Sequence, residues 1–177
     1  GITDQKSSGR CWLFTGLNVM RSQMIRQYGL GDFQFSQSYS FFYDQLEKSN
    51  LFLQAVIDNA KKPMSDQLND WLFKNPLSDG GTFCGVIDVV SKYGLVPADV
   101  MPESYNANNT SRMANILSLK LREYGLTLRK LSAAGKKSTE LEKQKLQMLG
   151  TIYHILTICL GEPVQHFTYT LRDASGK

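Results

Sequence analysis

The chain has 177 residues, of which 42% are hydrophobic and 20% are charged, and its formal net charge is +4. This composition is typical of a soluble globular protein, and the length is sufficient for one domain with its own core. No apolar run approaches the ~20 residues of a membrane span, and the modest charge permits an anionic partner without demanding one.

The three cysteines, Cys11, Cys84 and Cys159, lie far apart in the sequence. An odd and sparse count argues against a disulfide framework, and no spacing of cysteine and histidine indicates zinc, so we expect no metal site. Cys84 and Cys159 lie in segments with helical apolar periodicity, and we interpret both as thiols of the core. The start of the chain lacks the basic and apolar stretches of a signal peptide.

The first chemical motif is a cysteine where a polar, glycine-containing loop meets a predicted helix over residues 11–28, which Gly29 would end. The unpaired N–H groups and partial charge of about +0.5 at a helix N-terminus stabilise an anion, and thiolate is the nucleophilic form of cysteine. If the preceding loop folds back, the side-chain amide of Gln5 and the N–H of Cys11 converge on one oxyanion.

Together with Ser8, the residues Gln5, Gly9, Cys11 and Trp12 resemble the active-site segment of papain-like cysteine peptidases, in the bleomycin hydrolase and aminopeptidase C branch. The resemblance implies that Cys11 is the nucleophile and that Gln5 completes the oxyanion hole. Secreted papains have a disulfide cysteine where this chain has Ser8, which favours a reducing compartment. A cysteine beside a tryptophan is more often buried packing, but the full motif favours catalysis.

The next part of the chain is predicted to form three helices. The first begins after the N-cap candidate Ser36, and the second is capped by Ser49 or Asn50. Pro63 interrupts the second helix, and Ser65 can start the third. The apolar face of each helix indicates packing in the core.

A glycine pair, Gly80 and Gly81, precedes a predicted helix over residues 83–93. In the papain-like pattern, the second of two such glycines offers its N–H and C=O to an extended substrate, like one rung of a β-ladder. Glycine suits this role because no Cβ blocks the approach of a second backbone. A plain turn before a helix is the alternative, but alongside Cys11 we interpret Gly80 and Gly81 as substrate-binding residues.

Residues 106–163 depart from the papain-like pattern and are predicted to form a polar loop and an antiparallel pair of helices that break at Gly135. Bleomycin-hydrolase-like enzymes carry such an insertion. Residues 111–161 contain nine Lys or Arg and three Asp or Glu, a local net charge of +6. This is either a solvated basic face or a surface for subunits or nucleic acid, but no aromatic-interleaved basic run specifies nucleic acid.

Residues 164–171 alternate like a strand and a turn signal follows, so we expect the first arm of a β hairpin leading into a missing β lobe. In the papain-like family, that lobe supplies the catalytic histidine and the asparagine that orients it. Neither sequence context occurs here, so we expect both residues to lie outside this chain. The two histidines present, His154 and His166, lack the family's flanking residues and are not expected to be the base.

The expected fold is mostly α with a short C-terminal β hairpin: the helical (left) lobe of a papain-like α+β fold plus a helical insertion. The expected domains are residues 1–105 with the nucleophile helix, 106–163 as the insertion, and 164–177 as the start of the hairpin. The resemblance implies a cysteine-type aminopeptidase acting on peptides, without a cofactor, that is cytoplasmic and homohexameric. The chain would be its N-terminal portion, inactive alone, and an upstream targeting segment is left open.

Two other functions remain compatible with these residues. The basic insertion and the missing base also suit a non-catalytic helical interaction module. A thiol-redox or transferase protein would use Cys11 without a histidine, although no second cysteine lies near it in sequence as a resolving thiol. Covalent labelling of Cys11 by a peptidyl electrophile distinguishes the peptidase from both.

Overall fold

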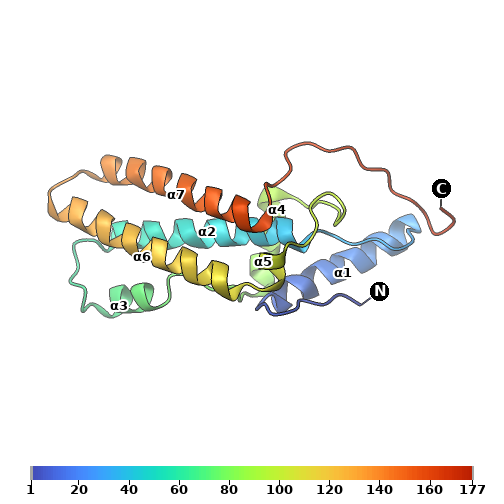
Figure 1. Cartoon of the computed structure of the whole chain (residues 1–177), viewed down its shortest axis with the longest axis horizontal. Helices are drawn as coiled ribbons and strands as arrows, with labels where there is room; N and C mark the ends of the chain where they lie inside the picture. The colour runs from blue at the N-terminus through green and yellow to red at the C-terminus, as the bar shows by residue number, and fades with distance from the viewer. Residues whose placement is uncertain (1, 177) are drawn as a thin grey trace. The chain divides into compact units, whose positions relative to one another are not determined.

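The computed structural model describes residues 2–176, and these form seven α-helices and three isolated β-bridges (Figure 1). The helices are α1 Cys11–Tyr28, α2 Gln37–Asp58, α3 Gln67–Lys74, α4 Phe83–Tyr93, α5 Tyr105–Asn108, α6 Ser111–Ala133 and α7 Ser138–Leu160. The chain divides into two compact units. The first comprises the residues up to 44, residues 79–110 and the residues from 157 onward, and the second comprises residues 45–78 and 111–156.

These units interleave along the chain, whereas the domain limits expected from the sequence follow chain order. In particular, residues 45–78 belong to the same unit as residues 111–156, which contain most of the expected insertion. Residues 79–110 return to the unit that contains α1. Helix α1 and the loop with the glycine pair therefore lie in one compact unit.

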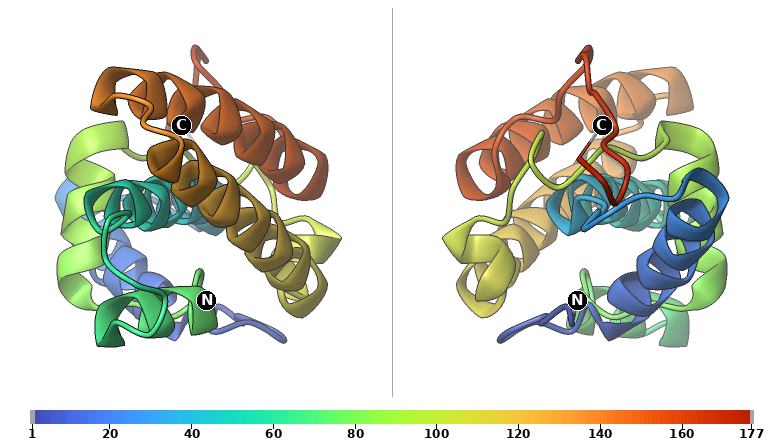
Figure 2. Two further views of the ribbon diagram at one scale, coloured as in Figure 1. Left: turned by 90° about the vertical axis from the view of Figure 1, so that its left-hand side faces the viewer. Right: turned by 90° about the vertical axis from the view of Figure 1, so that its right-hand side faces the viewer.

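In the first unit, α1 packs against α4 (Figure 2). The two helices approach closely at Gly16, where a Cβ would lie 2.7 Å from a methyl carbon of Val86. Helix α1 ends at Gly29, which adopts a left-handed conformation (φ 61°) and donates its N–H to the carbonyl of Ile25. The bounds predicted for this helix are confirmed.

Helix α2 is continuous, so the predicted division into two helices is wrong. Its start is as predicted, because the hydroxyl of Ser36 accepts a hydrogen bond from the N–H of Tyr39 at 3.0 Å. The second start predicted at Ser49 or Asn50 does not exist, because the Ser49 hydroxyl donates to the carbonyl of Gln45 at 2.7 Å. A serine that bonds to the carbonyl four residues earlier is satisfied inside a helix and does not cap a new one.

Two short helices differ from the sequence-based expectations. Helix α3 is capped by Asp66 and not by Ser65, since the Asp66 carboxylate accepts from the two N–H groups of residues 68 and 69. Helix α5 occupies part of the predicted polar loop and begins after Ser104, whose hydroxyl accepts from the N–H of Ala107 at 3.0 Å. Helix α4 is confirmed, with Gly94 directly after its last residue.

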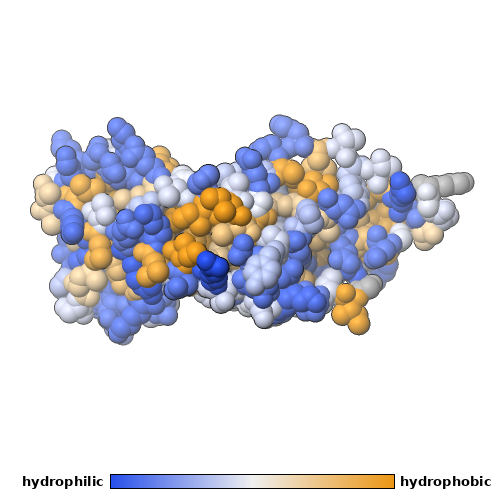
Figure 3. Space-filling model, viewed as in Figure 1, coloured by the Kyte–Doolittle hydropathy of each residue, from blue (hydrophilic) through white to orange (hydrophobic). Residues whose placement is uncertain are grey.

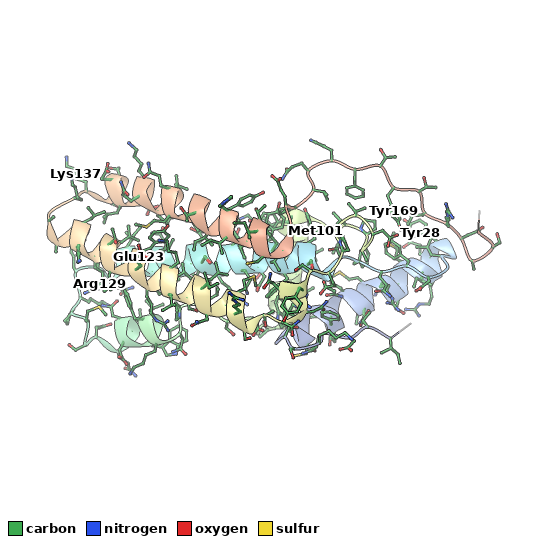
Figure 4. The ribbon with its side chains drawn as sticks, viewed as in Figure 1. Tyr28, Met101, Glu123, Arg129, Lys137 and Tyr169 are labelled. Carbon is green, nitrogen blue, oxygen red and sulfur yellow. The ribbon has the colours of Figure 1, made fainter. Side chains whose placement is uncertain are left out.

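In the second unit, α6 and most of α7 form the predicted antiparallel pair, joined by a turn at Gly135 (Figures 1 and 2). Arg129 of α6 points toward the loop before α3, where it donates to the carbonyls of Asn59 and Lys62 at 3.3 and 2.6 Å (Figure 4). Most of the buried apolar side chains of this unit come from α2, α6 and α7, and they include Phe52, Leu53, Val56, Leu117, Leu121, Leu128, Leu141, Met148 and Ile152.

The surface of α6 and α7 mixes hydrophilic and apolar side chains on the face drawn in Figure 3. The exposed apolar residues of these helices in the second unit include Ile116, Leu119, Leu126 and Leu146. Apolar side chains therefore lie among the hydrophilic ones on that face (Figure 3). Among residues 2–176, no helix combines the length and the apolar character needed to cross a bilayer.

The predicted C-terminal hairpin is not formed within the described residues, since residues 164–176 contain no strand. Their one bridge is antiparallel and joins Asp173 to Leu30 in the loop after α1, where the N–H of Ala174 donates to the carbonyl of Gly29 at 2.9 Å. Tyr169 lies edge-on to Phe33, with ring centroids 6.4 Å apart (Figure 4). Alternation predicted an extended segment, but a strand also requires a partner along its length.

Candidate active site

Cys11 is the first residue of α1, and its side chain is exposed. Its N–H is one of the four at a helix N-terminus that have no partner within the helix. Arg10 at the N-cap makes no side-chain cap hydrogen bond, so no side chain of the cap residue competes for these groups. The sulfur is thus open to a reactant at the positive end of a helix dipole.

The loop before Cys11 is folded back on itself, as the sequence analysis required. The amide nitrogen Nε2 of Gln5 donates to the carbonyl of Ser8 at 2.6 Å, and the hydroxyl of Ser8 donates to the carbonyl of Gln5 at the same distance. A side-chain amide carries two N–H donors, so one bond to Ser8 leaves the second available. Lys6, inside this loop, adopts a positive φ of 53°.

Arg10 fixes this loop to the rest of the first unit. Its Nε donates to the Ser8 hydroxyl at 3.0 Å, and its Nη2 lies 2.7 Å from a carboxylate oxygen of Glu103. The other oxygen of Glu103 accepts from the hydroxyl of Ser38 at 2.8 Å. The arginine side chain has no exposed surface. This buried network was missed by the sequence analysis, because no local pattern links residues that are 93 positions apart.

The glycine pair lies against the first turn of α1. A Cβ on Gly81 would lie 2.6 Å from Cε2 of Trp12, so the indole ring rests on the backbone of this glycine. The indole N–H of Trp12 donates to the carbonyl of Asp79 at 2.9 Å. The structure therefore brings Gly80 and Gly81 to the residue that follows Cys11, and packing on Trp12 gives Gly81 a structural reason to lack a side chain.

The other reactive side chains differ in their surroundings. Cys84 is exposed in the first turn of α4, so its assignment to the core is wrong. Cys159 is partly buried, and burial raises the pKa of its thiol. The side chains of His154 and His166 are exposed, and His154 lies in the unit that does not contain Cys11. Within residues 2–176, no three histidine, cysteine or acidic side chains are grouped to hold a metal ion.

Comparison with known proteins identifies relatives over the whole chain. The model of the Peptidase C1-like family matches residues 1–177. Bleomycin hydrolase of Homo sapiens is 42% identical over 174 residues, which cover 97% of this chain and 38% of that protein. Aminopeptidase C of Lactobacillus delbrueckii subsp. lactis is 41% identical over 175 residues, which cover 99% of this chain and 39% of that protein.

A solved structure shows the same fold. The crystal structure of PepW from Lactobacillus rhamnosis HN001 matches with a TM-score of 0.96 and 39% sequence identity, over 99% of this chain and 40% of that one. The chain thus spans about two fifths of the length of the relatives it matches. The resemblance inferred from the motif around Cys11 is confirmed, and the chain belongs to the Peptidase C1-like family.

Proposed function

We propose that the full-length protein is a cysteine-type aminopeptidase that removes N-terminal residues from peptides. The names of the relatives, bleomycin hydrolase and aminopeptidase C, support this reaction class. The observation that carries the proposal is the exposed thiol of Cys11 at the first position of α1, directly after a loop closed by Gln5.

In this mechanism, the Cys11 thiolate attacks the carbonyl carbon of the scissile peptide bond, and the carbonyl oxygen takes the electron pair. The amide of Gln5 and the N–H of Cys11 hold this oxyanion. Its collapse forms a thioester and expels the amine, which takes a proton from a histidine. Water then hydrolyses the thioester and restores the thiol. The backbone of Gly81 aligns the substrate, and the histidine and its orienting asparagine come from outside these 177 residues.

The remaining properties follow from the family resemblance. We propose that peptides are the substrates and that the protein works as a cytoplasmic homohexamer without a metal or cofactor. Nucleic acid remains a weaker candidate partner, because exposed apolar side chains lie among the hydrophilic ones on the surface of α6 and α7 (Figure 3). Sedimentation of the full-length protein measures its oligomeric state. Repeating it with nucleic acid at several salt concentrations tests that partner, since binding to phosphates weakens steeply with salt.

The decisive experiment is intact-mass analysis after exposure to a peptidyl vinyl sulfone. It compares the 177-residue chain with the full-length protein, and Cys11→Ser is the control in each. If the full-length protein is labelled at Cys11 and the 177-residue chain is not, the result supports the peptidase and a base that lies outside this chain. Rapid labelling of the short chain would instead bring His154 or His166 back as the base.

The other outcomes separate the rival functions. Labelling of neither protein would reject the peptidase and favour a helical interaction module. Labelling that depends on peroxide or disulfide would favour a thiol-redox protein. A preference for peptides with a free N-terminus over N-acetylated peptides of the same sequence would distinguish an aminopeptidase from an endopeptidase.

A further inference from the structure

The carboxylate of Asp79 reaches the nucleophile loop from the segment before the glycine pair. Its Oδ2 accepts a hydrogen bond from the N–H of Gly9 at 2.6 Å and another from the hydroxyl of Thr110 at 2.7 Å. The backbone carbonyl of Asp79 accepts from the indole N–H of Trp12 at 2.9 Å. Gly9 and Trp12 lie on either side of Cys11 in the chain. Asp79 therefore holds the backbone before Cys11 and the side chain that follows it.

The contact with Gly9 leaves no space between the two residues. A Cβ on Gly9 would lie 2.4 Å from Oδ1 of Asp79, so only a residue without a side chain lets the carboxylate approach in this way. A short bond from an N–H to a carboxylate is about twice as strong as one between neutral groups. This geometry ties the position of the loop to the position of the Asp79 side chain.

Thr110 extends the same connection to a second point of the loop. Its side chain is buried, and its N–H donates to the carbonyl of Ser7 at 3.2 Å. The N–H of Ser7 in turn donates to the carbonyl of Asn108 at 3.0 Å. The loop is thus held at Ser7 by the backbone around residue 109 and at Gly9 by Asp79, and Thr110 joins the two attachments.

Asp79 is also the residue directly before Gly80 and Gly81, whose backbone is the candidate substrate-binding segment. Since Trp12 packs on Gly81, a shift of Asp79 would move this segment relative to the first turn of α1. The Ser8 hydroxyl bonds within the loop, to the carbonyl of Gln5 and to Arg10. The hydrogen bonds of Asp79 to Gly9 and Trp12 connect the loop and the first turn of α1 to the segment that carries the glycine pair.

We propose that Asp79 is a positioning residue, which keeps the thiol of Cys11 and its oxyanion donors in register with the substrate backbone bound at Gly81. This inference rests on the proposed function, because it concerns the alignment of the same site. Alignment matters because a displacement of about 1 Å at a reacting group can cost ~100-fold in rate.

The test measures two rate constants for Cys11 in the full-length protein. A peptidyl vinyl sulfone reacts quickly only when its peptide backbone is aligned at the glycine segment and its alkene lies against the thiolate, whereas iodoacetamide requires only an accessible thiolate. For Asp79→Ala we expect a ten- to hundred-fold loss with the peptidyl reagent and a change within about threefold with iodoacetamide. Asp79→Asn retains an oxygen that can accept both hydrogen bonds, and we expect it to restore the peptidyl rate to within about fivefold.

Asp88→Ala is the matched control, because Asp88 is an exposed carboxylate on α4 in the same unit. We expect it to react like the wild type with both reagents. If Asp79→Ala reacts like Asp88→Ala, or if its rates with the two reagents fall equally, the inference is overturned while the proposed function stays intact. A wild type that is not labelled at Cys11 by the peptidyl reagent would instead reject the proposed function.

A second variant keeps the test conclusive if Asp79→Ala does not fold. Thr110→Val retains the shape of the side chain but removes its hydrogen bond to the Asp79 carboxylate. We expect a loss of about threefold to tenfold with the peptidyl reagent and an unchanged iodoacetamide rate. Equal behaviour of Thr110→Val and wild type with the peptidyl reagent would then overturn the inference.

Discussion

Arg10 Nη2 lies 2.7 Å from Glu103 Oε2, and the arginine side chain is fully buried while the glutamate side chain is 30% exposed. The same guanidinium lies over the rings of Phe14 and Phe41, 5.0 and 5.3 Å from their centroids. Such stacking suits a guanidinium better than an ammonium group, because the planar cation is weakly hydrated. A buried cation in the residue before Cys11 therefore anchors the start of α1.

Arg10→Met should destabilise the protein, because the Glu103 carboxylate would lose its charged partner. Removing one partner of a buried ion pair lowers the free energy of unfolding by about 3–5 kcal/mol. Because Glu103 is partly exposed, we expect a loss of roughly 2–4 kcal/mol here. Urea denaturation followed by circular dichroism measures the difference.

Lys74→Met is the matched control for this prediction. Lys74 and Asp70 form an ion pair at the same distance of 2.7 Å, but both side chains are more than half exposed. Exposed pairs contribute little, so the control should change the free energy of unfolding far less than Arg10→Met. Similar losses in the two variants would show that burial of the Arg10 pair has no energetic consequence.

The sequence predicted those parts of the fold that depend on local periodicity. The helix over residues 11–28 and its end at Gly29 followed from apolar spacing and from a residue that tolerates a positive φ. The break at Ser49 was predicted wrongly, because a capping residue and a self-satisfied serine inside a helix have the same sequence signature. The prediction of a C-terminal hairpin was wrong, because alternation indicates an extended segment but does not supply the partner strand.

The candidate site was predictable only where a local motif carried it. Gln5 and Cys11 could be assigned as candidate site residues because their spacing lies within one loop, and their catalytic roles stay a prediction. Asp79 and Arg10 were missed, because their partners Gly9 and Glu103 are 70 and 93 residues away in the chain. Nothing in a local pattern distinguishes a loop arginine that is solvated from one that is buried against a distant carboxylate.

Cys159 should react with iodoacetamide more slowly than an unstructured cysteine. Burial disfavours the charged thiolate and raises the pKa of this thiol, so less thiolate is present at any pH below that pKa. The alkylation rate of Cys159 should therefore rise at a higher pH than the alkylation rate of a model peptide thiol. Mass spectrometry of a chain with Cys11→Ser and Cys84→Ser, between about pH 7 and 10, measures the profile. A profile that coincides with that of the peptide would contradict the prediction.

Two helical glycines should respond to alanine in opposite directions. A Cβ on Gly150 in α7 meets no heavy atom within 4 Å, whereas a Cβ on Gly125 in α6 would lie 2.8 Å from the ring of Phe73. Gly150→Ala should stabilise the protein by about 0.5–1 kcal/mol, because alanine loses less backbone entropy in a helix. Gly125→Ala should destabilise it by about 1–3 kcal/mol through overpacking.

Thermal denaturation of the two glycine variants beside the wild type measures both signs in one series. Each variant serves as the control for the other, since both make the same chemical change inside a long helix. A stabilised Gly125→Ala would show that the ring of Phe73 yields without cost, and the packing between α6 and this ring would have to be looser than the structure indicates.

Gln5→Ala in the full-length protein should lower kcat by about 10²–10³-fold, as the loss of one oxyanion donor does elsewhere, with KM changed only a few-fold. The oxyanion exists only after the attack, so its donor contributes little to binding the substrate. Steady-state kinetics with a peptide that has a free N-terminus measures both constants.

Ser8→Ala separates this chemical role of Gln5 from its structural one. The variant removes the Ser8 hydroxyl, which bonds to the backbone of Gln5 and to Arg10, but it leaves the Gln5 amide in place. We therefore expect a much smaller decrease in kcat for Ser8→Ala than for Gln5→Ala. If both variants lose kcat equally, closure of the loop accounts for the effect, and the assignment of the Gln5 amide to the oxyanion must be abandoned.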